Sequence, residues 1–158
     1  MPTHSENRRL PYSPEQMYDL VADVARYPQF IPWISASRVR GVTPHGDHDV
    51  MLADLVIGFK MFRERFLSRV TMWPGSRRID TEYVDGPFKH MISKWEFAPD
   101  PEGGAGCEVR FEVDFEFKNS ILQGAAGLFF QEAMQRIVRA FEARADALYA
   151  EGARAATA

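Results

Sequence analysis

Residues 107–117, with the sequence CEVRFEVDFEF, decide the fold because apolar and charged side chains alternate at every position. Successive side chains of a β-strand point to opposite faces, so this stretch has one apolar face and one charged face. A strand with one buried and one solvated face is typical of an antiparallel sheet covered on a single side. The apolar face consists of Cys107, Val109, Phe111, Val113, Phe115 and Phe117.

The same two-residue period extends back from residue 118 to about residue 37, so we expect further strands before this one. Five turn signals divide the region into six strands, as a meander requires. One more strand is expected before the first helix, which makes a sheet of six to seven strands. The turn signals are His45-Gly46-Asp47-His48, Gly58-Phe59-Lys60, Trp73-Pro74-Gly75-Ser76, Asp85-Gly86-Pro87 and the segment from Pro101 to Gly106.

Two helices are expected on either side of these strands. Ser13, Pro14 and Gln16 form a helix start with a capping box, and that helix runs to about Val24. The second helix, residues 120–150, carries an apolar stripe at three- and four-residue steps and would be about 45 Å long. Its stripe consists of Leu122, Ala126, Phe130, Met134, Ile137, Phe141, Ala145 and Leu148.

We therefore predict an α+β protein of the helix-grip class, in which a bent antiparallel sheet wraps around the long C-terminal helix. Residues 1–150 form a single ligand-binding domain, and residues 151–158, which are small and rich in Ala, form a disordered tail.

Composition narrows the possible functions. Apolar residues make up 46% of the 158 residues and aromatic residues 13%, which excludes a disordered chain. A formal net charge of −3 argues against a protein that binds DNA through its phosphates. The single cysteine excludes an internal disulfide, and no apolar run reaches the length of a membrane span. Since the first residues do not resemble a targeting peptide, we expect a cytoplasmic protein, with peripheral contact at the inner membrane as an option.

Strand pairing predicts which side chains face the interior of the sheet. Two- and three-residue hairpin loops place Glu64, Ser68, Thr81 and Ser93 on this otherwise apolar face, with Ser68 directly opposite Thr81 and Ser93 one step diagonal. Buried polar groups need partners. Either these groups bond one another or the backbone, or they border a cavity and orient the polar head of a ligand.

The second alternative defines a candidate binding site between the sheet and the C-terminal helix. Phe30 and Trp33, from a segment held rigid by two prolines, either plug one end of the core or form the mouth of the pocket. The candidate ligand-binding residues are Phe30, Trp33, Leu55, Glu64, Phe66, Ser68, Thr81, Ser93, Trp95, Phe111, Phe115, Phe130, Met134 and Ile137.

The sequence gives weaker evidence for metal binding or catalysis. His45 and His48 flank a turn with Asp47, but a structural zinc site needs four converging ligands, so we predict a solvated turn and no metal. Cys107 is expected to be a core residue and not a nucleophile. Glu64 is the one candidate general base, for an enzyme acting on a hydrophobic, polyketide-like substrate, and it has no positioned acid partner.

A basic surface needs a separate interpretation. Arg63, Arg65 and Arg69 share the outer face of one strand, and Arg78 lies on the neighbouring strand. Acidic residues of the neighbouring strand, Asp80 and Glu82, lie among these arginines. They favour a solvent-exposed face on which positive and negative charges balance. The alternative is a docking patch for acidic lipid heads or ribosomal RNA.

The chain resembles the coenzyme Q-binding START-like proteins over residues 3–148. The resemblance is carried by several stretches in order and spacing. They are YSPEQMYDLV (residues 12–21), Asp23, YPQFIPW (27–33), SRV (68–70), GPFK (86–89), Trp95, Phe97 and AFEARA (140–145).

This resemblance implies the helix-grip fold of the polyketide cyclase and birch-pollen-allergen-like superfamily. It implies a protein that binds ubiquinone or a related polyisoprenoid and supports respiratory electron transport as a carrier or chaperone, with no cofactor and no enzymatic activity. The family also includes the bacterial ribosome-association toxins, so a ribosomal subunit is the partner in the alternative prediction.

Overall fold

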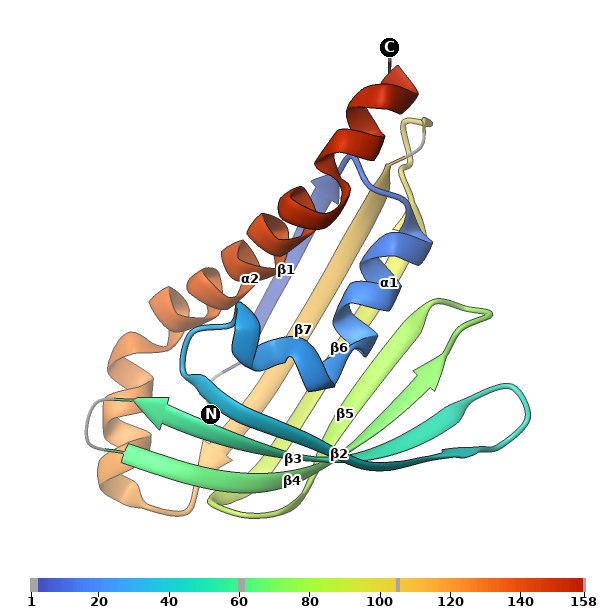
Figure 1. Cartoon of the computed structure of the whole chain (residues 1–158). Coiled ribbons are helices and arrows are strands. Elements are labelled where there is room, and N and C mark those ends of the chain that lie inside the picture. Colours follow the sequence, from blue (N-terminus) through green and yellow to red (C-terminus); the bar gives the residue numbers. More distant parts are fainter. Residues whose placement is uncertain (1–2, 60–61, 105, 158) are drawn as a thin grey trace.

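The predicted sheet is present, and the long helix lies across it (Figure 1). The computed structural model describes residues 3–59, 62–104 and 106–157. Within these residues seven antiparallel strands pair in the order β1-β7-β6-β5-β4-β3-β2. The elements are β1 (Thr3–Leu10), α1 (Pro14–Ala22), η1 (Val24–Gln29), β2 (Ile34–Pro44), β3 (Asp49–Phe59), β4 (Phe62–Trp73), β5 (Arg78–Asp85), β6 (Phe88–Pro99), β7 (Cys107–Phe117) and α2 (Ser120–Thr157).

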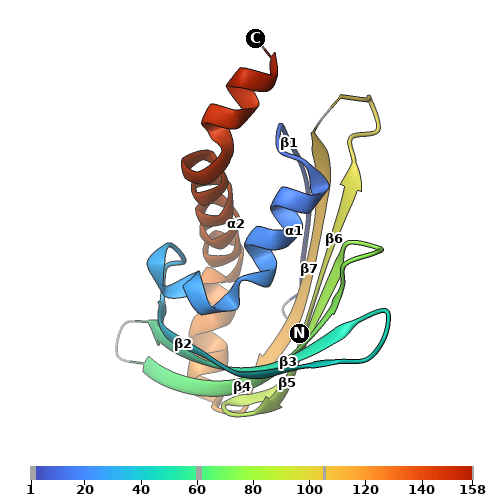
Figure 2. The ribbon, with the colours of Figure 1, turned by 45° about the vertical axis from the view of Figure 1, so that its right-hand side comes forward.

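The sheet is strongly bent, and both α-helices lie on its concave side (Figure 2). Strands β1, β6 and β7 run beside α2, whereas β2, β3 and β4 turn away beneath it (Figures 1 and 2). This is the helix-grip architecture predicted from the alternating strands and the long apolar helix.

The start of α1 confirms the predicted capping box. The Ser13 hydroxyl accepts a hydrogen bond from the Gln16 N–H at 3.1 Å, and the Gln16 side chain accepts one from the Ser13 N–H at 3.0 Å. Two backbone donors at the helix end are thereby satisfied. The helix ends at Ala22, slightly before the predicted end, because the chain continues as the 3-10 helix η1.

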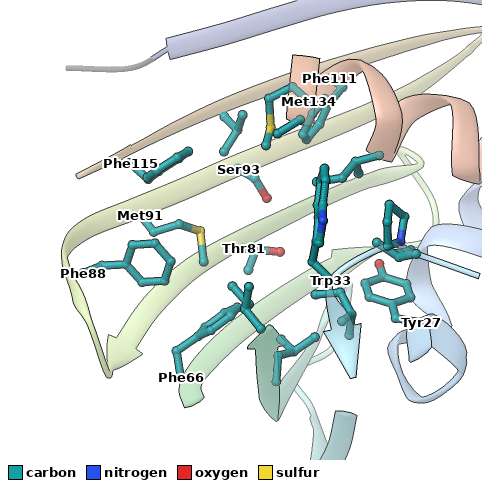
Figure 3. A pocket seen from close by; sticks show the side chains of 18 of the residues that line it. Tyr27, Trp33, Phe66, Thr81, Phe88, Met91, Ser93, Phe111, Phe115 and Met134 are labelled. Carbon is teal, nitrogen blue, oxygen red and sulfur yellow. The ribbon is translucent and has the colours of Figure 1, made fainter. Parts of the chain in front are cut away.

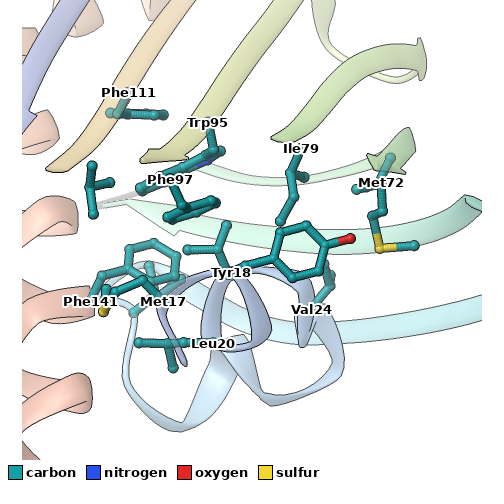
Figure 4. Packing of buried hydrophobic residues seen from close by; sticks show 14 of the residues in the cluster. Met17, Tyr18, Leu20, Val24, Met72, Ile79, Trp95, Phe97, Phe111 and Phe141 are labelled. Atoms are coloured by element: carbon teal, nitrogen blue, oxygen red, sulfur yellow. The ribbon is translucent and has the colours of Figure 1, made fainter. Parts of the chain in front are cut away.

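Helix α1 closes one end of the core against β5 and β6 (Figure 4). Met17 and Val21 are almost fully buried, and Tyr18 packs edge-on against Phe97 with 6.1 Å between ring centroids. Full burial of a side chain of this size stabilises the fold by about 1.5–3 kcal/mol. Consequently this end of the sheet is filled by protein side chains.

The register of β4 with β5 differs from the prediction. Thr81 lies opposite Val70 and not opposite Ser68, while Ser93 lies directly opposite Thr81. The cause is the turn, because Trp73 pairs with Arg78 across four residues where a two-residue loop was expected. The difference is an even number of residues, so the predicted inner face is preserved. The predicted shared face of β3 and β4 is confirmed, since Leu55 lies opposite Phe66, whereas Phe59 pairs with Phe62 and does not belong to the loop as expected.

Helix α2 is longer than predicted. It begins at Ser120, as expected, but continues to Thr157 through most of the segment that the sequence analysis assigned to a disordered tail. Four of the eight residues in that segment are Ala, which is the strongest helix former. No helix in the described part of the chain is long and apolar enough to cross a membrane.

Gly86, in the turn between β5 and β6, tests the close packing of the bent sheet. Its φ is +142°, and an added Cβ would lie 2.7 Å from the Phe66 Cβ and 2.8 Å from the Arg65 carbonyl oxygen. We expect Gly86→Ala to lower the free energy of unfolding by roughly 2–4 kcal/mol, from backbone strain and overpacking. Urea denaturation of the two proteins measures the change.

Gly75→Ala is the matched control. Gly75 lies in the turn between β4 and β5, where a new Cβ meets no atom of the described residues within 4 Å. Its substitution should change stability by less than about 0.5 kcal/mol. Equal stabilities of the two variants would contradict the packing assigned to Gly86.

Candidate functional site

A cavity of about 310 Å³ lies between the inner face of the sheet and α2 (Figure 3). Side chains from η1, the loop before β2, strands β2 to β7 and α2 line it. Most of the predicted site residues meet there, because the pleat of each strand points them inward. They are Trp33, Leu55, Glu64, Phe66, Thr81, Ser93, Trp95, Phe111, Phe115, Met134 and Ile137.

Further lining residues were not selected from the sequence. Ile57, Met91, Val113, Phe117 and Phe141 belong to alternating or helical apolar patterns that the sequence does show. Tyr27, Ile31 and Pro32 come from a segment without any period, so no pattern could identify them. The complete set of additional residues is Tyr27, Ile31, Pro32, Ile34, Ile57, Phe88, Met91, Val113, Phe117, Ala133 and Phe141.

One end of the cavity is closed by stacked aromatic rings. Trp95 on β6 stacks on Phe111 of β7 with 4.3 Å between centroids, and it meets Phe141 of α2 edge-on at 5.1 Å. Phe141 also packs on Tyr27 at 5.5 Å. Because these rings come from η1, two strands and α2, they fix the height of the helix above the sheet.

The opposite part of the cavity is built around Phe88 at the start of β6. Its ring lies 5.3 Å from Phe66 and 4.7 Å from Phe117, and Phe115 is 5.9 Å away. Such contacts each add about 0.5–1.5 kcal/mol beyond the burial of area. The wall is therefore rigid, aromatic and apolar.

Thr81 and Ser93 are the hydroxyl groups of the cavity floor (Figure 3). They face each other across β5 and β6, and both are half-buried. Neither side chain makes a hydrogen bond to another of the described residues, so both hydroxyls can still donate and accept. The third hydroxyl, of Tyr27, donates to the Val21 carbonyl, and burial raises its pKa.

Glu64 is the acidic residue of the lining. It lies on β4 opposite Ile57 and is half-buried. Its carboxylate forms no ion pair within the described residues. The Glu64 carboxylate can therefore accept hydrogen bonds from a ligand, and the hydroxyls of Thr81 and Ser93 can donate them.

Two of the predicted site residues lie outside the cavity, and the side chain of Phe130 lies outside the described residues. Ser68 is fully buried and donates to the Ala53 carbonyl oxygen at 3.3 Å, which is the backbone bonding left open by the sequence. Phe30 packs behind the cavity, with 5.3 Å between the centroids of its ring and the Phe141 ring. The Arg144 guanidinium lies over the Phe30 ring, 5.3 Å from its centroid. Phe30 therefore plugs the core, whereas Trp33 lines the cavity.

Trp33 has a backbone conformation that is rare for a residue with a side chain. Its φ is +70°, in the left-handed region, and its carbonyl accepts a hydrogen bond from the Gly58 N–H at 2.7 Å. Two prolines nearby, Pro28 and Pro32, restrict the segment. This conformation directs the indole toward the cavity (Figure 3), and the pairing with β3 holds it there.

Cys107 and the histidine turn show no sign of catalytic chemistry. Cys107 is fully buried, and burial raises the pKa of its thiol to about 11, which disfavours the thiolate. His45 and His48 stack with 5.3 Å between centroids, and His48 contacts Asp47 at 2.7 Å. Among the described residues, no cluster of three potential metal ligands occurs.

Arginines gather on the outer face of β2 and β4, and we refer to them as the arginine face. Arg40 binds Asp54 through two hydrogen bonds, of 2.5 and 3.0 Å, and Arg65 contacts the same carboxylate at 3.3 Å. The Arg40 guanidinium lowers the pKa of Asp54. The strand register places Arg38, Arg63, Arg65 and Arg69 on this face, and the hydrogen bonds to Asp54 place Arg40 there.

Comparison with known proteins assigns this architecture to a family. Residues 10–142 match the family described as "Polyketide cyclase / dehydrase and lipid transport". The ribosome association toxin RatA of Escherichia coli is 37% identical over 149 residues, which cover 94% of this chain and 90% of that protein.

Two more proteins are informative. The coenzyme Q-binding protein COQ10 homolog B, mitochondrial, of Xenopus laevis is 36% identical over 152 residues, which cover 92% of this chain and 59% of that protein. The structure of a START superfamily protein from Mycobacterium smegmatis superposes with a TM-score of 0.73 at 20% identity, over 92% of this chain and 98% of that one. At that identity the superposition shows the shared fold.

Proposed function

The chain belongs to the polyketide cyclase, dehydrase and lipid transport family, and we propose that it binds ubiquinone or a related polyisoprenoid lipid in the cavity beneath α2. The observation that carries this proposal is the pair of hydroxyls on an otherwise apolar floor. Thr81 and Ser93 face each other and make no side-chain hydrogen bond within the described residues. Small-molecule sites are usually apolar pockets with a few polar groups that orient the ligand.

The chemistry of a quinone head fits these groups. A quinone carbonyl oxygen accepts hydrogen bonds, and each hydroxyl can donate one. The flat ring matches the aromatic walls made by Trp95, Phe111 and Phe88, where offset or edge-on contacts are favoured. The name of the Xenopus relative, a coenzyme Q-binding protein, supports the same ligand.

The size of the cavity indicates how much of such a lipid it encloses. Its volume of about 310 Å³ is at the lower end of the roughly 300–1,000 Å³ found for pockets of drug-sized ligands. We therefore propose that the head group and the first part of the tail lie inside, and that the rest of a long tail leaves between Trp33 and α2.

We propose a carrier or chaperone role and not catalysis. General acid–base work needs a donor and an acceptor in reach of the reacting atoms. The lining offers one carboxylate, Glu64, without an ionisable partner among the described residues. A carrier of this kind supports respiratory electron transport from the cytoplasm, with transient contact at the membrane that holds the quinone.

The hydroxyl pair provides the test. Replacing both hydroxyls, as Thr81→Val/Ser93→Ala, should weaken the binding of a short-chain ubiquinone by about 5- to 100-fold, since two hydrogen bonds of about 0.5–1.5 kcal/mol each are lost. Quenching of tryptophan fluorescence measures this affinity, because Trp33 and Trp95 line the cavity.

Thr71→Val is the control. Thr71 lies on the outer face of β4, opposite Asp80, so the same substitution removes a hydroxyl outside the cavity. The control should bind as the wild type does. If the wild type fails to bind the quinone, the proposed ligand is wrong; if the double variant binds equally well, the hydroxyls do not hold the head group.

A second function is favoured by the arginine face. Its exposed guanidinium groups lie on one side of the sheet, and Arg38 and Arg63 form no ion pair within the described residues. Arginine clusters bind phosphate well. Together with the name of the Escherichia coli relative, this surface supports association with a ribosomal subunit as the alternative role.

Arg63→Gln/Arg65→Gln tests this alternative by co-sedimentation with ribosomal subunits at several salt concentrations. If the face binds phosphates, the double variant should bind more weakly, and the slope of log affinity against log salt should fall in magnitude by about 1–2. Arg26→Gln/Arg136→Gln, which removes two exposed arginines paired with Asp23 and Glu132, is the control. Equal binding by both double variants would remove the arginine face from this role.

A further inference from the structure

The lining of the cavity is electrically one-sided. Glu64 contributes a carboxylate, and no Lys, Arg or His occurs among the described residues of the lining. Tyr27, the other titratable group there, keeps its proton because burial raises its pKa. A molecule that enters the cavity therefore meets one negative charge and no positive charge.

The arginines nearest in sequence do not alter this balance. Arg63 and Arg65 flank Glu64 on β4, but neighbouring side chains of a strand point to opposite faces of the sheet. Arg65 contacts Asp54 on the outer face at 3.3 Å, and Arg63 is exposed. The sheet thus separates the arginine face from the carboxylate that borders the cavity.

Glu64 lies near the start of β4, opposite Ile57, and its side chain is half-buried. Trp33 and Ile57 are half-buried as well, whereas Phe66 and Trp95 are buried. Glu64 therefore borders the cavity where solvent still reaches the lining, and a ligand in the cavity shares that space with its carboxylate.

We propose that Glu64 is a specificity-determining residue that restricts the cavity to uncharged lipids and excludes anionic ones, such as fatty acids and prenyl phosphates. This inference rests on the proposed lipid-binding function and names the class of lipid. An anion that leaves water for an apolar cavity loses its hydration, and only a paired cation offsets that cost. Here the anion meets a like charge in a region of low dielectric constant, which strengthens the repulsion.

An uncharged head is accepted for the converse reason. A quinone, an alcohol or an ester loses little hydration, and the hydroxyls on the floor replace its hydrogen bonds to water. Anionic and neutral lipids share the same apolar chains, so the apolar wall cannot distinguish them. The discrimination therefore depends on the charges of the lining, and Glu64 adds to it the repulsion of a like charge.

Two probes of equal chain length test this inference, 1-decanol and decanoate, at pH 8, where decanoate is ionised. Isothermal titration of the full chain measures both affinities directly, without a quinone. We expect the wild type to bind decanol at least about tenfold more tightly than decanoate. Glu64→Gln should bind decanoate several-fold more tightly than the wild type does, with decanol affinity changed less than about twofold.

Two further variants complete the experiment. Glu82→Gln removes a carboxylate from the outer face of β5, where it pairs with Arg69 at 2.7 Å, and should leave both affinities unchanged. Glu64→Asp keeps the charge and should keep the discrimination, which separates charge from any loss of folding in Glu64→Gln. Circular dichroism of each variant checks the fold.

Equal binding of decanol and decanoate by the wild type would overturn the inference, as would unchanged discrimination in a folded Glu64→Gln variant. Titration of the wild type with a short-chain ubiquinone forms a separate arm. If the wild type discriminates between the two decyl probes but does not bind the quinone, the role of Glu64 stands and the proposed quinone ligand is wrong.

Discussion

Phe141 determines the position of α2, and the cavity depends on that position. This buried ring of α2 packs against Trp95 of β6 at 5.1 Å, Phe30 at 5.3 Å and Tyr27 of η1 at 5.5 Å. It thereby joins the helix to the sheet and to the segment that leads into β2. From this contact the helix continues over the bent sheet toward its own N-terminus (Figure 1). Ala133, Met134 and Ile137 of this part of the helix line the cavity (Figure 3). A flat sheet would leave no such space beneath a straight helix.

The two faces of one strand carry the two surfaces of functional interest. On β4, Glu64 and Phe66 face the cavity, and Arg63, Arg65 and Arg69 face solvent. Buried Asp54 binds Arg40 and Arg65, and Glu82 binds Arg69, so three of the arginines on this face are held in place by carboxylates. Alternation along a single strand therefore separates the lining of an apolar cavity from a surface rich in arginine. Both classes of relative, quinone-binding and ribosome-associated, are compatible with such a chain.

The architecture could be predicted from the sequence because its signals are local and periodic. Residues 107–117 identify a half-buried strand, and the stripe that includes Phe141 identifies the covering helix. The inner face was predicted correctly, but the exact register was not, because register depends on the position and length of each turn. The turn after Trp73 has four residues, with Arg77 at a φ of +53°, and a proline followed by glycine did not reveal that length.

The cavity was less predictable, because its lining comes from segments brought together by tertiary packing. Tyr27 and Ile31 lie in a segment without a period, and Tyr27 is positioned by its contact with Phe141 of α2. Ser68 and Thr81 have the same inward orientation. However, the register pairs Ser68 with Ala53, where a backbone carbonyl accepts its hydrogen bond, and pairs Thr81 with Ser93 on the floor of the cavity. Alternation identifies a face, but it does not show where along that face the helix leaves space.

The most direct test of the central claim is the identity of what the cavity holds in the cell. Protein purified under native conditions from a quinone-producing host would be extracted with organic solvent, and the extract examined by mass spectrometry. We expect an isoprenoid quinone in stoichiometric amount. Repeated extracts that contain no isoprenoid quinone, from protein that remains folded, would contradict it.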